Sequence, residues 1–182
     1  MSGVRCMALR TRFGDDMVRS LHHQREATVS DGSTSRDADR SRVYAAEDQW
    51  TALLDRGGQV DFFGSTLDVR PQLRFGSLEA MESYVAELVD RHTTSAVRVR
   101  HRRGRAKAHY VDGVIAIPAD ANWACRQSVL LHEFAHHLAG AEHGHDRRFR
   151  FIMISLVDGE LGPEAALLLR AGYQAQGLVC DV

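Results

Sequence analysis

His132-Glu133-Phe134-Ala135-His136 is the stretch that decides how the rest of this chain is interpreted, and it has the form HExxH. Residues four apart on an α-helix lie on one face, so both imidazoles would point to the same side. Two neutral imidazoles at that separation can share one Zn²⁺ ion. Glu133 can reach a water molecule on the metal and take its proton as a general base. The stretch therefore predicts a helix that carries a hydrolytic metal site.

The residues around this motif are typical of a core helix. Asn122 can cap the start of a helix, and Gly140 can end one. Between them, apolar residues recur too often for a helix that faces solvent: Val129, Leu130, Phe134 and Leu138. We therefore expect a buried helix over residues 123–140, with the two histidines of the motif facing a cleft.

A zinc site needs at least one more protein ligand, and three known spacings do not supply it. The metzincin pattern HExxHxxGxxH requires glycine and histidine where this chain has Ala139 and Glu142. The three-histidine spacing of bacterial endoribonucleases also places a ligand at Glu142. A thermolysin-like site would use a later glutamate, but neither Glu160 nor Glu164 stands in a recognisable signature.

Two histidines in the following glycine-containing loop remain as candidates for the third ligand, His143 and His145. Phe149 lies one helical turn after His145, where a buried ring would fix the direction of that imidazole. His143 has Arg147 at the same offset, and a charged side chain anchors nothing in a core. The spacing therefore favours His145 and leaves His143 as the alternative.

The segment His145–Phe149 reads H-D-x-x-F, and apolar residues dominate positions 150–157 after it. It resembles the third-ligand segment of SprT-like and WLM-type metalloproteases, although related loops usually carry His-Gly-Pro and this loop has no proline. The chain is also similar to a small actinobacterial family of zinc metallohydrolases, over roughly residues 36–178, through the segments Arg36–Glu47, Val60–Ser65 and Leu161–Ala166. The resemblance implies an α+β, zincin-like domain with a small, mostly antiparallel sheet, and Zn²⁺ held by His132, His136 and His145.

Length and composition are consistent with one cytoplasmic catalytic domain. The chain has 182 residues, of which 44% are hydrophobic, and a formal net charge of −1. No apolar run is long enough to span a bilayer, and the first residues lack the apolar core of a signal peptide. The three cysteines are widely spaced and form no CxxC pair, which indicates a reducing compartment.

Residues 1–35 differ in character from the rest, because a polar, Gly- and Ser-bearing stretch near their end has no hydrophobic periodicity. We expect a disordered leader over 1–35 and a single domain over 36–182. Within the domain, a first helix would end at Gly57-Gly58, and Ser77 would cap a second. The patterns predict further helices over 123–140, 147–158 and 163–175, and strands over 60–63, 65–69, 97–103, 106–111 and 114–117.

Two of the predicted strands suggest partners. Val114–Pro118 could be a sheet edge above the metal, where an extended peptide or protein substrate adds by main-chain hydrogen bonds, and Pro118 is tolerated at an edge. Arg98–Lys107 is the one basic block and could contact nucleic acid phosphates, but it lacks interleaved aromatic residues and is not the favoured reading.

The sequence thus predicts a zinc-dependent hydrolase, foremost a peptidase, in which Glu133 is the general base. The oxyanion-stabilising residue stays open among Tyr110, His109 and Arg147. Asp146 could orient a ligand imidazole or cap the next helix. Two alternatives are a non-catalytic binding module stapled by zinc, with His143 or Glu142 closing the site, and a metal-dependent nuclease.

Overall fold

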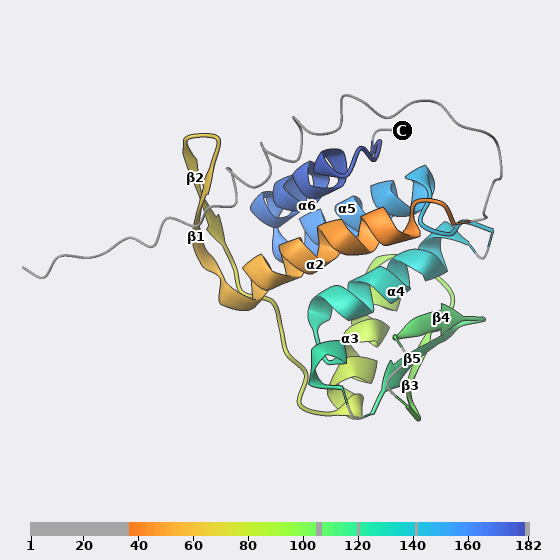
Figure 1. The fold of residues 1–182 in the computed structure, drawn as a ribbon. Coiled ribbons are helices and arrows are strands. Elements are labelled where there is room, and N and C mark those ends of the chain that lie inside the picture. Colours follow the sequence, from red (N-terminus) through yellow and green to blue (C-terminus); the bar gives the residue numbers. More distant parts are fainter. Residues whose placement is uncertain (1–36, 105–106, 120, 141, 181–182) are drawn as a thin grey trace, which may run out of the picture.

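The computed structural model describes residues 37–104, 107–119, 121–140 and 142–180, so the predicted leader lies outside the described residues. The chain forms an α+β fold in which a helical layer packs beside a small sheet (Figure 1). The described elements are, in order, α2 (Arg40–Arg56), β1 (Gly58–Phe62), β2 (Ser65–Val69), α3 (Leu78–Arg91), β3 (Arg98–Arg102), β4 (His109–Val111), β5 (Val114–Pro118), α4 (Gln127–Ala139), α5 (Arg147–Leu161) and α6 (Pro163–Ala175). None of these described helices combines the length and the apolar character needed to cross a membrane.

Helix α2 forms because its apolar residues recur at helical spacing, and these bury one face: Val43, Ala46, Trp50, Leu53 and Leu54. The buried face packs on α6, where the Trp50 indole donates a hydrogen bond to the carbonyl oxygen of Ala165 at 3.0 Å. The helix ends at Arg56, and Gly57 follows with φ of 61°, as the glycine pair predicted.

The prediction that residues 114–118 form a sheet edge is wrong. The three-stranded sheet has the order β3-β5-β4, so β5 is the central strand, parallel to β3 and antiparallel to β4. Four consecutive residues of β5, Ile115–Pro118, are buried, as expected for a strand covered on both faces. The sequence signal was the continuous apolar run, which outweighs a proline at the strand's last position. Among the described strands, β3 and β4 form the two edges of this sheet.

Both hairpins turn at a pair of residues with positive φ. Asp112 and Gly113 join β4 to β5 with φ values of 47° and 76°, the conformation that favours an Asp-Gly pair. Phe63 and Gly64 connect the antiparallel strands β1 and β2 in the same way. Ser77 caps α3, because its hydroxyl accepts a hydrogen bond from the backbone N–H of Ala80.

The motif helix begins later than expected. Residues Asn122–Ala124 form a separate 3-10 turn, and α4 starts at Gln127, so Asn122 does not cap it. The Gln127 side chain instead bridges two neighbouring segments: its oxygen accepts from the Leu73 backbone N–H, and its nitrogen donates to the Tyr84 hydroxyl. The apolar face of α4 packs on α5 and on the sheet. Of the four residues predicted for it, Leu130 and Phe134 are buried, whereas Val129 and Leu138 are partly buried.

Candidate metal centre

Three imidazoles meet where α4 faces the start of α5. His132 and His136 lie one turn apart on α4, and His145 stands just before Arg147, the first residue of α5. One ring nitrogen of each lies within 4.8 Å of the others, and His132 and His145 are buried while His136 is partly buried. The structure thus brings His145, and not His143, to the two histidines of the motif.

The spacing of these nitrogens fits a metal ion. Two nitrogens bound at ~2.0–2.1 Å to a tetrahedral ion lie roughly 3.3 Å apart. The Nε2 atoms of His132 and His145 are 3.3 Å apart, so this pair already has the separation that such an ion requires. Three imidazoles suit zinc, copper, iron and nickel, and the cluster could hold any of them.

Two carboxylates from the start of the described chain determine which nitrogen each ring offers. Glu47 on α2 lies 2.7 Å from Nδ1 of His132, and Asp37 lies 2.9 Å from Nδ1 of His145. A carboxylate accepts the Nδ1–H proton, which leaves Nε2 of the same ring free to bind a metal. Sequence reasoning assigned no role to either acid, because 85 and 108 residues separate them from their histidines.

Glu47 is itself buried, and it also accepts a hydrogen bond from the Tyr173 hydroxyl on α6. Burial alone would raise the pKa of Glu47, but the adjacent His132 ring lowers it below its usual value. Burial likewise works to lower the pKa of His132, yet the Glu47 carboxylate raises it. The pair therefore places a negative charge directly behind one candidate ligand.

The loop that delivers His145 is held from α5. The Arg150 guanidinium is buried and donates to the His145 carbonyl oxygen at 2.7 Å and to Asp39 at 2.6 Å. Phe149 is fully buried, and its ring lies 5.0 Å from His145 and 4.4 Å from His136 between ring centroids. The expectation that Phe149 buries its ring against His145 is confirmed.

Glu133 lies beside the imidazoles at the point where α4 meets the sheet. The backbone amide of Tyr110 on the edge strand β4 lies close enough to act on the pKa of this carboxyl, which it lowers. Burial raises the pKa of Glu133 above its usual value, and burial lowers the pKa of His136 to about 3. A carboxylate with a raised pKa accepts a proton more readily, which suits a general base.

Tyr44 is a residue of this centre that sequence reasoning missed. Its ring stacks on His132 at 5.3 Å and lies tilted against His145 at 5.1 Å. The ammonium group of Lys107, the chain's single lysine, lies 3.3 Å from the centre of the same ring. The spacing Tyr44-x-x-Glu47 on one helix face could have indicated a pair directed to one site, but nothing local indicated which site.

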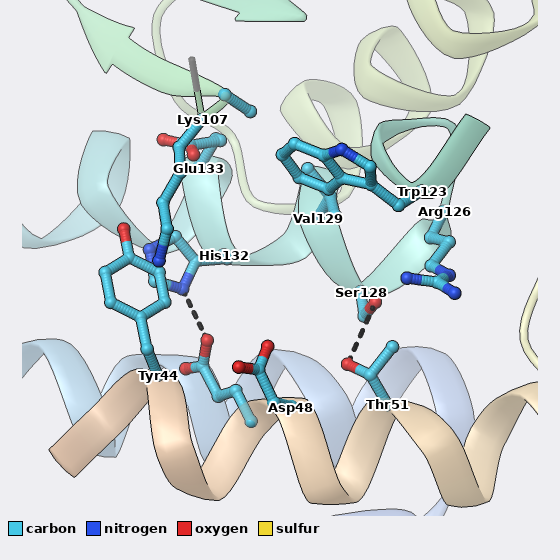
Figure 2. A pocket seen from close by; sticks show the side chains of 12 residues that line it. Tyr44, Asp48, Thr51, Lys107, Trp123, Arg126, Ser128, Val129, His132 and Glu133 are labelled. Carbon is cyan, nitrogen blue, oxygen red and sulfur yellow. Dashed lines mark hydrogen bonds and ion pairs between the residues drawn. The ribbon is translucent and has the colours of Figure 1, made fainter. Parts of the chain in front are cut away.

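The candidate centre opens into a cleft with two hollows. Figure 2 shows the first, a space of about 250 Å³ between α2 and α4 that runs from His132 and Glu133 toward Trp123 and Arg126. The second, about 450 Å³, lies beside β4 and includes His136, His145 and Asp112. Tyr44, Ala108 and Glu133 line both hollows, so the two extend to either side of the imidazoles.

The other candidate residues bond to partners outside the cluster of three imidazoles. His143 bonds through Nδ1 to Asp146 at 2.6 Å, and Asp146 caps α5 by accepting from the Phe149 N–H, so the cap role is confirmed. Glu160 pairs with Arg91, far from the imidazoles in the fold. His137, next to a ligand candidate, instead bonds through Nδ1 to the Tyr110 hydroxyl at 2.8 Å.

The residues predicted to stabilise an oxyanion are dispersed. Only His109 and Tyr110 line the cleft, and Arg147 lies in a separate hollow on the outside of α5. The Tyr110 hydroxyl is occupied, because it contacts His137 and accepts from the backbone N–H of Gly113 at 2.9 Å. His109 contacts the Arg102 guanidinium through Nδ1.

Comparison with known proteins adds no relative, since no family model, curated protein or solved structure matches this chain. The resemblance to SprT-like and WLM-type enzymes therefore stays a prediction from the motifs.

Proposed function

We propose that this protein is a zinc-dependent hydrolase with a zincin-like fold, and foremost a peptidase. The single observation that carries the proposal is the cluster of His132, His136 and His145 with the Glu133 carboxylate beside it. Catalytic zinc sites combine three protein ligands with an open position, and a cleft adjoins this cluster. Zinc bound there would supply the Lewis acidity that makes water acidic and polarises a carbonyl group.

The side chains around the cluster divide the chemical work. Glu133 takes the proton of the attacking water and returns it to the departing nitrogen. Glu47 and Asp37 hold two of the imidazoles with Nε2 toward the ion. Phe149 and the walls of the cleft exclude water from the rear of the cluster, which strengthens the interactions of charges within it.

The edge strand β4 supports a peptide as substrate. Within the part of the chain that the structure describes, β4 pairs with β5 along one side alone, and its residues line the hollow beside His136 and Glu133. An extended peptide could add to this edge by main-chain hydrogen bonds. The docking strand expected at 114–118 is thus proposed instead at 109–111.

The deciding experiment measures metal and hydrolysis together. Purified wild-type protein should contain about one zinc ion per chain by mass spectrometry. Glu133→Gln should keep that zinc but lower kcat for a peptide substrate by at least about a hundredfold, because it removes the general base. A wild-type protein without stoichiometric metal, or a Glu133→Gln variant with full activity, would contradict the proposal.

The rival functions have less support in the geometry. A structural zinc module needs a closed site, usually with four protein ligands, and within the described residues only three imidazoles cluster. Glu142 is exposed and His143 bonds to Asp146, so neither reaches the cluster. The nuclease hypothesis depends on β3, where Arg98 and Arg100 are exposed. Nucleic acid binding whose affinity falls steeply as salt increases would support it.

A further inference from the structure

The metal cluster and Glu133 leave one step without an assigned residue, the stabilisation of the oxyanion, and Tyr44 lies beside them. Figure 2 shows its ring rising from α2 beside His132, with the hydroxyl end directed away from α2 toward the side of Glu133. The ring contacts two of the three imidazoles, and the charge of the Glu133 carboxylate acts on the phenol group. Tyr44 also lines both hollows of the cleft.

The hydrogen of this hydroxyl is available for a ligand. The guanidinium carbon of Arg40, one helical turn before Tyr44, lies 5.7 Å from the centre of the phenol ring. Within the described part of the chain, the Tyr44 hydroxyl donates to no acceptor. A phenol is an acid with a pKa near 10, so it keeps its proton at neutral pH. The proton is therefore available to an acceptor bound in the cleft that Tyr44 lines.

We propose that Tyr44 is a catalytic residue whose hydroxyl binds the oxyanion of the reaction. The inference rests on the proposed function and names the anion this site would bind: the tetrahedral species formed from a peptide carbonyl. When water adds to the carbonyl carbon, its proton passes to Glu133, and the carbonyl π electrons move onto the oxygen. Tyr44 donates its hydrogen bond to that oxygen. Glu133 then gives the proton to the nitrogen as the C–N bond breaks.

The alternatives in the same cleft fit this task less well. The Tyr110 hydroxyl already contacts His137 and the Gly113 N–H, so turning it toward the cluster would break both contacts. The Lys107 ammonium packs over the face of the Tyr44 ring, which places the cation against the phenol and not beyond its hydroxyl. Donors of this kind act because they are already oriented where charge develops.

Kinetics with zinc-loaded protein give the first test. Removing one oxyanion donor lowers kcat by about a hundredfold to a thousandfold. Tyr44→Phe keeps the ring against the imidazoles, so we expect such a loss in kcat with little change in KM and unchanged zinc content. An unchanged kcat in Tyr44→Phe would overturn the proposal.

Binding of an anionic analogue gives a readout that does not depend on turnover. N-phosphoryl-leucinamide carries a tetrahedral anion, whereas N-acetyl-leucinamide carries a neutral planar carbonyl. By calorimetry on zinc-loaded protein, Tyr44→Phe should weaken the phosphoryl compound by about tenfold or more, since a hydrogen bond to a charged group is lost. Affinity for the acetyl compound should stay the same. Tyr84→Phe is the matched control, because its hydroxyl lies at Gln127 and Glu160.

The outcomes separate this inference from the proposed function. Phosphoryl binding that depends on Tyr44, in a protein that cleaves no peptide, would keep the oxyanion site and contradict the peptidase. Hydrolysis that is lost in Glu133→Gln but unchanged in Tyr44→Phe would support the peptidase and contradict the oxyanion site. A loss of phosphoryl binding in Tyr110→Phe or Lys107→Met, but not in Tyr44→Phe, would assign the oxyanion to that residue and refute the inference. A wild-type protein that binds no phosphoryl compound would also refute it.

Discussion

At the scale of single residues, the two carboxylates behind the imidazoles are the groups that tune metal binding. Glu47 is buried and Asp37 is partly exposed, yet both contact an Nδ1 atom within 3.0 Å. A carboxylate in this position fixes the ring tautomer and raises the basicity of the opposite nitrogen. The buried contact should matter more, because water screens the exposed one.

We therefore predict that Glu47→Gln lowers zinc affinity by about tenfold to a hundredfold, the range measured for such partners in other metal sites. Asp37→Asn should lower it by less. Competition with a chromophoric chelator measures both affinities. Asp48→Asn is the control: it removes the next acid on α2, which is exposed and contacts no imidazole, and should leave affinity unchanged. Equal affinity in the wild type and Glu47→Gln would contradict the assignment.

At the scale of elements, the exit from α4 decides whether His145 can reach the cluster. Gly140 ends the helix with φ of 99° and ψ of 155°, a conformation nearly restricted to glycine. A Cβ atom there would also meet the Glu142 carboxylate at 2.8 Å, although that flexible side chain can move. The backbone strain is therefore the larger obstacle, and it lies in the loop that leads to His145.

Gly140→Ala should lower the free energy of unfolding by about 1–3 kcal/mol, the range for a non-glycine residue in such a conformation. It should also weaken zinc binding, because relief of the strain displaces the loop. Gly159→Ala is a matched change: Gly159 is exposed within α5, and nothing lies within 4 Å of its added Cβ. That variant should gain about 0.5–1 kcal/mol. Denaturant titration measures the free energy of unfolding of each variant. Equal changes in the two variants would contradict the prediction.

At the scale of the whole molecule, the candidate centre lies where the helical layer meets the sheet (Figure 1). Its side chains come from α2, α4, the loop before α5 and the edge strand β4. Each of these segments is also anchored by apolar packing of its own, such as Trp50 of α2 and Phe134 of α4, both nearly inaccessible to solvent. The apolar core therefore stabilises the fold, and a bound metal ion would add further stability.

Removal of the metal should accordingly leave the protein folded. If zinc is present at a thousandfold excess over Kd, its loss lowers the free energy of unfolding by about 4 kcal/mol. For a chain of this length that corresponds to a fall in Tm of roughly 8–16 °C. After chelation, circular dichroism should keep its helical signal and a cooperative transition. Unfolding at room temperature on chelation would indicate a structural zinc site instead.

Local patterns were enough to predict the elements and part of the centre. The spacing of His132 and His136 follows from the helix period, and the offset of Phe149 from His145 uses the same rule. Turns at Gly57 and Asp112-Gly113 follow from the backbone freedom of those residues, and the cap at Ser77 from its side-chain oxygen. These features depend on neighbours within a few residues, so they can be predicted from the sequence alone.

The sequence by itself therefore determined the motif helix, the helix and strand segments around it, and the preference for His145 over His143. Only the tertiary structure decided that β5 is the central strand, that α4 begins at Gln127, and that α2 faces the imidazoles. Glu47, Asp37 and Tyr44 join the centre through that packing. The physical reason is that burial drives association without direction. Which apolar faces meet depends on the whole set of elements, and no local period records it.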